Sequence, residues 1–304
     1  MIVKSGTPED ITIEENTAWT VKSLLQWGSN RLTSQGIEST DLTCELFLSH
    51  VLQCSRIDLH RDPNKSISSN ESAQFKDYIE RRCSREPVQY ILGECEFMGL
   101  RFRVDPRVLI PRPETEILVQ EVIDITKSQP IEIKNILDIG TGSGNIAISL
   151  AKFLPNCRIN AIDVSYDALE MAWSNIRMHE VQHQVNLMHA DFLGDDVRLL
   201  DGEYDVIVSN PPYISRVEFQ KLEPEISSFE PAIATTDNSD GLTFFRAIAQ
   251  KAQSLIQPEG FVFVEMAYGQ KKAVEEIFQL SGFDEIGVIS DYNKIERVLR
   301  ATRR

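Results

Sequence analysis

The sequence predicts an α/β protein in which a doubly wound sheet domain follows a small helical domain, with a β-hairpin linking the two. From residue 131 onward, short apolar runs alternate with runs of helical spacing, a pattern typical of parallel strands joined by helices. One predicted strand, residues 135–139, leads into a glycine-rich turn. Another, residues 204–209, ends in Asn210-Pro211-Pro212-Tyr213, and ligands bind at the carboxyl ends of strands in such sheets.

The first part of the chain is predicted to be helical. Residues 1–16 are polar and uncapped, so we expect a loose tail. Between residues 17 and 87, apolar residues follow helical spacing up to a stop at Gly36, again after Ser39, and again after Asn70. Nine basic and nine acidic residues balance in this stretch. We expect a helical domain over residues 17–87 that serves as a substrate-recognition module or as a spacer.

The stretch 88–112 has a different pattern. Residues 88–93 and 96–104 alternate like two short strands with glycines at the turns, which predicts a hairpin linker over residues 88–112. Pro113 then suits the first turn of a helix, and acidic residues at 114 and 116 favour the positive end of its dipole. Arg112, between two prolines, either pairs with a carboxylate or shapes the floor of a site.

The remaining residues, 113–304, are predicted to form one doubly wound domain. Short apolar segments bounded by turn residues identify its strands. The predicted strands are residues 135–139, 158–162, 185–188, 204–209 and 261–265, with two more near 286–289 and 297–300.

The turn Gly140-Thr141-Gly142-Ser143-Gly144 indicates a ligand site. A glycine-rich turn at a helix N-terminus allows close approach to the backbone and presents unpaired N–H groups. The spacing is typical of S-adenosylmethionine binders, yet with Ala147 it also matches the dinucleotide fingerprint. The turn alone leaves both open. Asp163 ends the next predicted strand, where its carboxylate is expected to accept hydrogen bonds from ribose hydroxyls.

Asn210-Pro211-Pro212-Tyr213 is the most informative stretch. Both Asn210 and Pro211 precede a proline, so their backbones are restricted together. The two prolines lack N–H groups, and this corner therefore offers acceptors to a ligand with two N–H donors, such as an amide or an exocyclic amine. Tyr213 adds an aromatic face for a flat group. The alternative is an ordinary loop, because Asn-Pro is also a common turn signal.

Composition excludes several classes. The net charge is −15, and residues 88–304 carry 21 basic against 33 acidic side chains, which disfavours a nucleic-acid surface. Five cysteines without a C-x-x-C pair indicate reduced, mostly buried thiols of a cytosolic protein. No apolar run approaches the length of a membrane span. A cytoplasmic protein with no metal site and no membrane attachment is expected.

Four motifs together resemble the release factor glutamine methyltransferases, the family called PrmC or HemK. They are Ile110-Pro111-Arg112-Pro113-Glu114-Thr115-Glu116, Asp138-Ile139-Gly140-Thr141-Gly142-Ser143-Gly144, Asn210-Pro211-Pro212-Tyr213-Ile214, and Glu230-Pro231 with Asp240-Gly241-Leu242. The Asn-Pro-Pro-Tyr motif alone is shared with adenine-N6 nucleic-acid methyltransferases and the ribosomal-protein glutamine methyltransferase. The chain departs from the family's usual glycines at Ala267 and within residues 291–294.

The resemblance implies a Rossmann-like methyltransferase sheet and transfer of a methyl group from S-adenosylmethionine, leaving S-adenosylhomocysteine. The acceptor would be the side-chain amide nitrogen (N5) of the glutamine in the Gly-Gly-Gln motif of bacterial class I peptide release factors. The implied partners are these protein substrates, without direct nucleic-acid binding, and the implied state is a monomer. Adenine-N6 nucleic-acid methylation, ribosomal-protein glutamine methylation, and a binding protein without catalysis remain the alternatives.

The resemblance also assigns roles to residues. The Asn210 side-chain oxygen and the Pro211 carbonyl would accept the two amide hydrogens, Pro212 would complete the rigid corner, and Tyr213 would pack on the amide plane. Asn210 would also border the cofactor. The other cofactor-binding residues would be Gly140, Thr141, Gly142, Ser143 and Gly144 for the methionine portion, Asp163 for the ribose, and Asp191 with Phe192 for the adenine.

Overall fold

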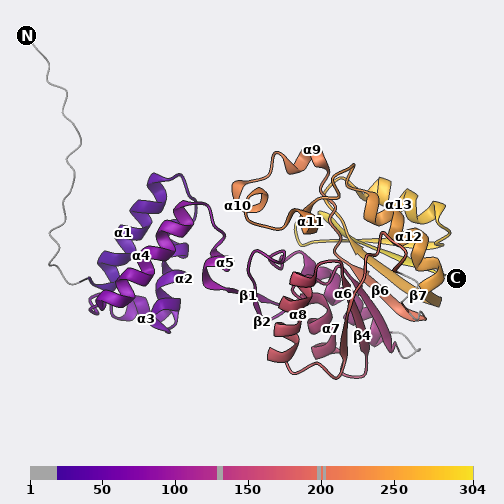
Figure 1. The fold of residues 1–304 in the computed structure, drawn as a ribbon, viewed down its shortest axis with the longest axis horizontal. Helices are drawn as coiled ribbons and strands as arrows, with labels where there is room; N and C mark the ends of the chain where they lie inside the picture. The colour runs from indigo at the N-terminus through magenta and orange to yellow at the C-terminus, as the bar shows by residue number, and fades with distance from the viewer. Residues whose placement is uncertain (1–18, 129–132, 197–199, 201–202, 304) are drawn as a thin grey trace, which may run out of the picture. The chain divides into compact units, whose positions relative to one another are not determined.

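The structure is a computed structural model that describes residues 19–128, 133–196, 200 and 203–303 (Figure 1). The expected tail at residues 1–16 lies outside the described residues. The chain forms two compact units that divide between Ile91 and Leu92. No helix within the described ranges is both long and apolar enough to cross a membrane.

The first unit is helical, as predicted. Leu24, Phe47, Phe75 and Ile79 are fully buried in it, so burial of one apolar stripe per helix stabilises the bundle. One short helix, α3 (Arg56–Arg61), was not predicted; it begins at the capping box of Ser55. The helices of this unit are α1 (Val21–Ser34), α2 (Thr40–Leu52), α3 (Arg56–Arg61), α4 (Ser69–Cys83) and the start of α5 (Val88–Leu92).

The hairpin exists, but neither predicted strand was right, because the turn at Met98 and Gly99 lies inside the second predicted strand, residues 96–104. Residues 88–92 form the short helix α5, because the carbonyl of Pro87 accepts from the N–H groups of Tyr90 and Ile91 and begins a helical turn. The hairpin instead pairs β1 (Glu94–Phe97) with β2 (Leu100–Arg103). Met98 and Gly99 both have positive φ, 52° and 69°, as a two-residue type I′ turn requires.

The second unit is built on a seven-stranded sheet in the order β5-β4-β3-β6-β7-β9-β8. Strands β3 to β7 are parallel, and β9 runs antiparallel to both β7 and β8. All seven predicted strands are present. They are β3 (Asn135–Ile139), β4 (Arg158–Asp163), β5 (Val185–His189), β6 (Tyr204–Ser209), β7 (Ile256–Glu265), β8 (Glu285–Ser290) and β9 (Glu296–Thr302).

Helices cover both faces of this sheet, which confirms the doubly wound class. The longer helices are α6 (Thr115–Ser128), α7 (Asn145–Phe153), α8 (Tyr166–Met178), α12 (Thr243–Leu255) and α13 (Lys271–Leu280). Three short helices follow β6: α9 (Arg216–Phe219), α10 (Pro224–Ser227) and α11 (Ala232–Thr235).

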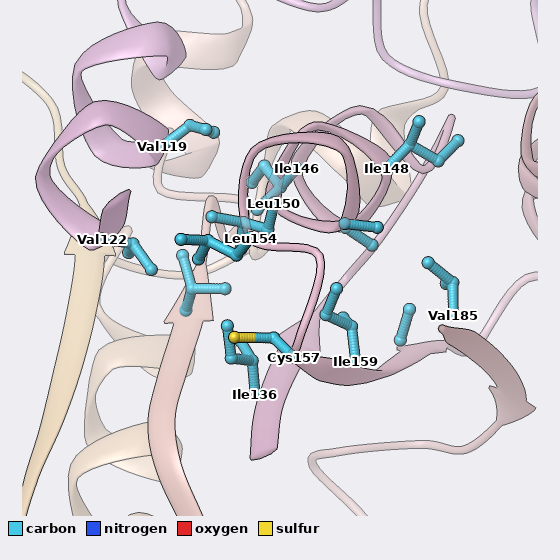
Figure 2. Close-up of a cluster of buried hydrophobic side chains, with 14 of the residues drawn as sticks. Val119, Val122, Ile136, Ile146, Ile148, Leu150, Leu154, Cys157, Ile159 and Val185 are labelled. Carbon is cyan, nitrogen blue, oxygen red and sulfur yellow. The ribbon is translucent and has the colours of Figure 1, made fainter. Parts of the chain in front are cut away.

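Successive residues of a strand pack into two separate hydrophobic cores, one on each face of the sheet. Ile136 packs with α6 and α7 (Figure 2), whereas the next residue, Leu137, packs with α12 and α13. Val206 and Ile207 divide in the same way. Side chains on a strand alternate between faces, so a strand covered on both faces must be apolar throughout. The aromatic rings of the hairpin, Phe97 and Phe102, join the first of these cores.

The five cysteines are free thiols, as expected, but most are not buried. Cys44 and Cys157 are buried, and Cys157 lies in the core shown in Figure 2. Cys54, Cys83 and Cys95 are partly exposed. The prediction of mostly buried thiols was therefore wrong.

Candidate active site

A cavity of about 530 Å³ opens at the carboxyl ends of β3, β4 and β6, within the second unit. This volume is in the range of small-molecule sites. The cavity brings together most of the residues that the sequence singled out, although they lie far apart in the chain. Its wall includes Gly140, Thr141, Gly142, Ser143, Asp163, Asp191, Phe192, Asn210, Pro211 and Pro212. Gly144 and Tyr213 are not among the lining residues.

The glycine turn exposes its backbone to this cavity. Gly140 and Gly142 have φ of 74° and 55°, and a Cβ added at either would meet no atom within 4 Å beyond its chain neighbours. The space over the turn is therefore available to a ligand. Gly144 differs, because a Cβ there would lie 3.0 Å from Ile148 and 3.4 Å from Ala172. It allows close packing between α7 and α8.

Asp163, at the end of β4, holds the glycine turn. Its Oδ2 accepts from the Gly142 N–H and its Oδ1 from the Ser165 N–H, both at 2.9 Å. Burial raises the pKa of Asp163, and the backbone donors oppose this rise. The sequence predicted a role for Asp163 in ribose binding, and the structure shows a second role in fixing the turn.

Asp138 supports the same turn from inside β3. It is fully buried and its Oδ2 accepts from the Thr141 hydroxyl at 2.7 Å. Burial raises its pKa to about 7. No separate role was predicted for Asp138, although a charged residue in an otherwise apolar strand indicates one.

Asn210 follows β6 and is oriented by the helix that begins beside it. Its Nδ2 donates to the Thr115 hydroxyl at 3.0 Å. Thr115 is buried, and it also lines the cavity. Because the amide nitrogen is engaged, the oxygen Oδ1 is the group that the Asn210 side chain offers as an acceptor. No role for Thr115 was predicted from the sequence.

Tyr213 is anchored through its hydroxyl. The hydroxyl donates to Oε1 of Glu265 at 3.1 Å, and Glu265 is 2% exposed at the end of β7. Burial raises the pKa of Tyr213, and the Glu265 carboxyl raises it further. Burial raises the pKa of Glu265 to about 7, while hydrogen bonds from Thr115 and Tyr213 oppose the rise. The sequence signal for Glu265 was a carboxylate at the end of an otherwise apolar strand.

The backbone of Tyr213 is fixed from the other side. Its carbonyl accepts from Gln270 Nε2 at 2.9 Å. Gly241 has φ of 81°, and a Cβ there would lie 2.5 Å from the Tyr213 carbonyl oxygen. Asp237 holds the Gly241 loop by accepting from the N–H groups of Ser239, Gly241 and Thr243. A glycine is required here because two backbone segments touch.

Asp191 and Phe192 belong to a loop that α12 secures. Lys251 Nζ donates to the carbonyls of Phe192 and Gly194, the second at 2.7 Å, and lies 5.4 Å from the centre of the Phe192 ring. Asp191 Oδ1 accepts from the Leu193 N–H at 2.9 Å. The loop is therefore held by a lysine from α12 and by a hydrogen bond within the loop itself.

Arg112 combines both roles left open by its sequence. It lines the cavity, and its Nη2 donates to Oε1 of the buried Glu230. Burial raises the pKa of Glu230, and the Arg112 charge opposes that rise. The ion pair joins the start of α6 to the loop before α11. Across the described ranges, no three or more His, Cys, Asp or Glu side chains form a cluster able to hold a metal ion.

Two family models match the chain. The PrmC N-terminal domain matches residues 23–93, which cover most of the helical unit. The methyltransferase small domain matches residues 114–225, which contain the glycine turn, Asp163 and Asn210.

Curated proteins similar to this chain span nearly its whole length. The release factor glutamine methyltransferase of Geobacter sulfurreducens is 37% identical over 286 residues, 94% of this chain and 98% of that protein. The protein of the same name from Chlorobaculum tepidum is 36% identical over 289 residues, again 94% and 98% of the two chains. Among solved structures, a methyltransferase from Pyrococcus furiosus superposes with a TM-score of 0.50 at 20% identity, over 78% of this chain and 99% of its own. This last similarity concerns the fold alone.

Replacing Gly241 by alanine should destabilise the protein. The new Cβ meets the Tyr213 carbonyl at 2.5 Å in a left-handed backbone, so we expect a loss of about 1–3 kcal/mol in the free energy of unfolding. Gly269→Ala is the matched control, because Gly269 has φ of 85° and nothing within 4 Å of its Cβ position. Denaturant unfolding should show a smaller loss for the control; equal losses would contradict the clash.

The buried carboxyl of Asp138 should make stability depend on pH. Its pKa is raised above the unfolded value, so its contribution is complete below about pH 4 and is lost as the pH rises through about 7. The unfolding free energy of the wild type minus that of Asp138→Asn should fall by about 1–3 kcal/mol from pH 4 to 8.

Asp237 gives the control of opposite sign for this experiment. Its pKa is lowered by the hydrogen bonds that it accepts, so its contribution is present above its unfolded pKa and is lost on acidification. The corresponding difference for Asp237→Asn should rise with pH. Two differences that change with pH in the same direction would show that one of the two assignments is wrong.

Proposed function

The chain belongs to the release factor glutamine methyltransferases, and from this membership we infer that it methylates release factors on a glutamine side chain. We propose in detail that the acceptor is the N5 nitrogen of the glutamine in the Gly-Gly-Gln motif of class I peptide release factors. The proposed methyl donor is S-adenosylmethionine. Relatives 36–37% identical over 94% of this chain support the enzyme class. The orientation of the Asn210 amide, whose Nδ2 donates to Thr115, is the single structural observation that supports the proposed chemistry.

The cavity fits the proposed cofactor. Open space lies over Gly140 and Gly142, where a ligand's methionine portion would lie against backbone N–H groups. Asp163, Asp191 and Phe192 line the same cavity, and we assign them to the ribose and the adenine. When bound, S-adenosylmethionine supplies an electrophilic methyl group on a sulfonium centre.

The glutamine amide needs positioning more than it needs a base. Its nitrogen is a poor nucleophile because its lone pair is delocalised into the carbonyl. We propose that Asn210 Oδ1 and the Pro211 carbonyl accept its two hydrogens, so that the nitrogen is held in one orientation. Pro211 and Pro212 have no N–H to compete. Well-oriented reactants gain up to about 7–11 kcal/mol from positioning. The proton leaves after methyl transfer, so no prior deprotonation is required.

The direct test incubates the protein with labelled S-adenosylmethionine and one of three acceptors: purified release factor, ribosomal protein, or an adenine-containing oligonucleotide. Peptide mass spectrometry then locates the methyl group. Methylation of the Gly-Gly-Gln glutamine is the expected result. Methyl transfer to the oligonucleotide or the ribosomal protein alone would reject the proposal in favour of that acceptor. We also propose that the helical unit recognises the release factor, and mutations there should raise KM for it.

Removing the Asn210 side chain should stop methyl transfer. Asn210→Ala deletes the acceptor oxygen, and we expect kcat to fall at least about 100-fold, with the dissociation constant of the cofactor changed less than about threefold. Asn186→Ala is the control, because Asn186 is an exposed amide on β5 outside the cavity. Normal turnover by Asn210→Ala would refute the assigned role.

Removing the Asp163 side chain should mainly weaken cofactor binding. Asp163→Ala loses the proposed ribose acceptor and releases the Gly142 N–H, so a 10- to 100-fold weaker affinity is expected, roughly the value of one or two charge-assisted hydrogen bonds. Asp205→Ala is the matched control, because Asp205 also accepts from two backbone N–H groups. These belong to Lys134, just before β3, and to Asn135, the first residue of β3. Equal affinities in both variants would count against the ribose assignment.

A further inference from the structure

The ends of β6 and β7 place a buried carboxyl beside the proposed methyl-transfer site. These strands are parallel neighbours, and Ser209 is in register with Val264. Asn210 therefore follows one strand where Glu265 ends the other. Glu265 is 2% exposed and does not line the cavity. A buried carboxyl is costly unless donors face it, so its neighbours decide what it does.

Two hydroxyl groups act on Glu265. The Tyr213 hydroxyl donates to Oε1 at 3.1 Å, and the buried Thr115 hydroxyl lies close enough to the carboxyl to oppose the rise in its pKa. Oε2 has no hydrogen-bond partner among the described residues, so it is the oxygen left to accept a proton from Thr115. A threonine hydroxyl carries one proton and two lone pairs. When that proton points to Glu265, the lone pairs remain for the Asn210 Nδ2, which lies 3.0 Å away. The three contacts are thus mutually consistent in direction.

We propose that Glu265 is a positioning residue for the amide acceptor. Through Thr115 it fixes the Asn210 amide so that the oxygen, and not the NH₂ group, points into the cavity. Through Tyr213 it holds the aromatic ring. As far as catalysis is concerned, this inference rests on the proposed function. Without the Thr115 acceptor, the Asn210 amide can reverse and aim its NH₂ group at the substrate NH₂. Two donors then face each other, and the nitrogen loses its fixed orientation.

The charge on Glu265 should control this relay. The ionised carboxylate can only accept hydrogen bonds, whereas a protonated one competes as a donor. The groups that act on it are Thr115 and Glu114 at the start of α6, Tyr213 after β6, and Arg297 on β9. Burial outweighs the others and raises its pKa to about 7. We expect kcat to rise with pH through this range in the wild type, and Glu265→Gln to remove that rise.

The test uses the full chain and three threonine variants. Thr115→Val keeps the shape and removes the hydroxyl, and kcat should fall about 10- to 100-fold, the effect of one unmade buried hydrogen bond. The cofactor dissociation constant should stay within about twofold. Thr115→Ser restores the hydroxyl and should recover most of kcat. Thr126→Val is the control on the same helix, because its hydroxyl bonds only the Val122 carbonyl within the described residues.

A second readout is independent of turnover. The side-chain NH₂ signal of Asn210 in ¹H–¹⁵N NMR, assigned by its loss in Asn210→Ala, should shift in Thr115→Val and titrate near pH 7 in the wild type. It should not titrate in Glu265→Gln. If the wild type does not methylate release factor, the proposed function is rejected, but the NMR measurement still tests the positioning role of Glu265. An Asn210 signal unchanged in folded Thr115→Val, or unchanged kcat in that variant, would overturn the positioning role.

Discussion

The hydrogen bond from the Ser209 hydroxyl to the Ile139 carbonyl, 2.8 Å and fully buried, joins the two strand ends on which the site depends. From β3 the chain proceeds to β4 and β5 on one side, while β6 and β7 lie on the other. The helices after β3 and β6 therefore diverge to opposite faces, and a crevice opens between them. The glycine turn and Asn210 face that crevice because Ile139 and Ser209 are in register.

Acidic side chains lie around this crevice, three of them buried and Asp163 partly buried, and each accepts from donors of another segment. Asp138 and Asp163 hold the glycine turn, Glu230 pairs with Arg112, and Glu265 receives Tyr213. Burial raises the pKa of every one of them. Such groups reduce stability compared with apolar side chains, so their shared location at one edge of the sheet is better explained by ligand binding and positioning than by folding.

Sequence patterns predicted what depends on near neighbours in the chain. Apolar runs identified all seven strands of the large sheet, and the glycine-rich turn and the proline-rich corner identified part of the cavity wall. The error at residues 88–92 arose because a short apolar run fits a helix as well as a strand. Thr115 and Glu265 were missed because their partners, Asn210 and Tyr213, lie 95 and 52 residues away. Residues 291–294 lack the glycine that is usual in the family, and Lys294 takes the positive φ, 64°, that a glycine adopts more readily.

The position of β9 also constrains how the chain is made. This strand follows β8 in the sequence but lies between β7 and β8 in the sheet, so among the strands that the structure describes only β9 lies beside β8. During synthesis β8 has no strand to pair with until residues 296–302 have left the ribosome. Until then the edge of β7 presents open N–H and C=O groups, which invite pairing with another nascent chain. Co-translational folding of this sheet should therefore pause after five strands and finish in a single late insertion.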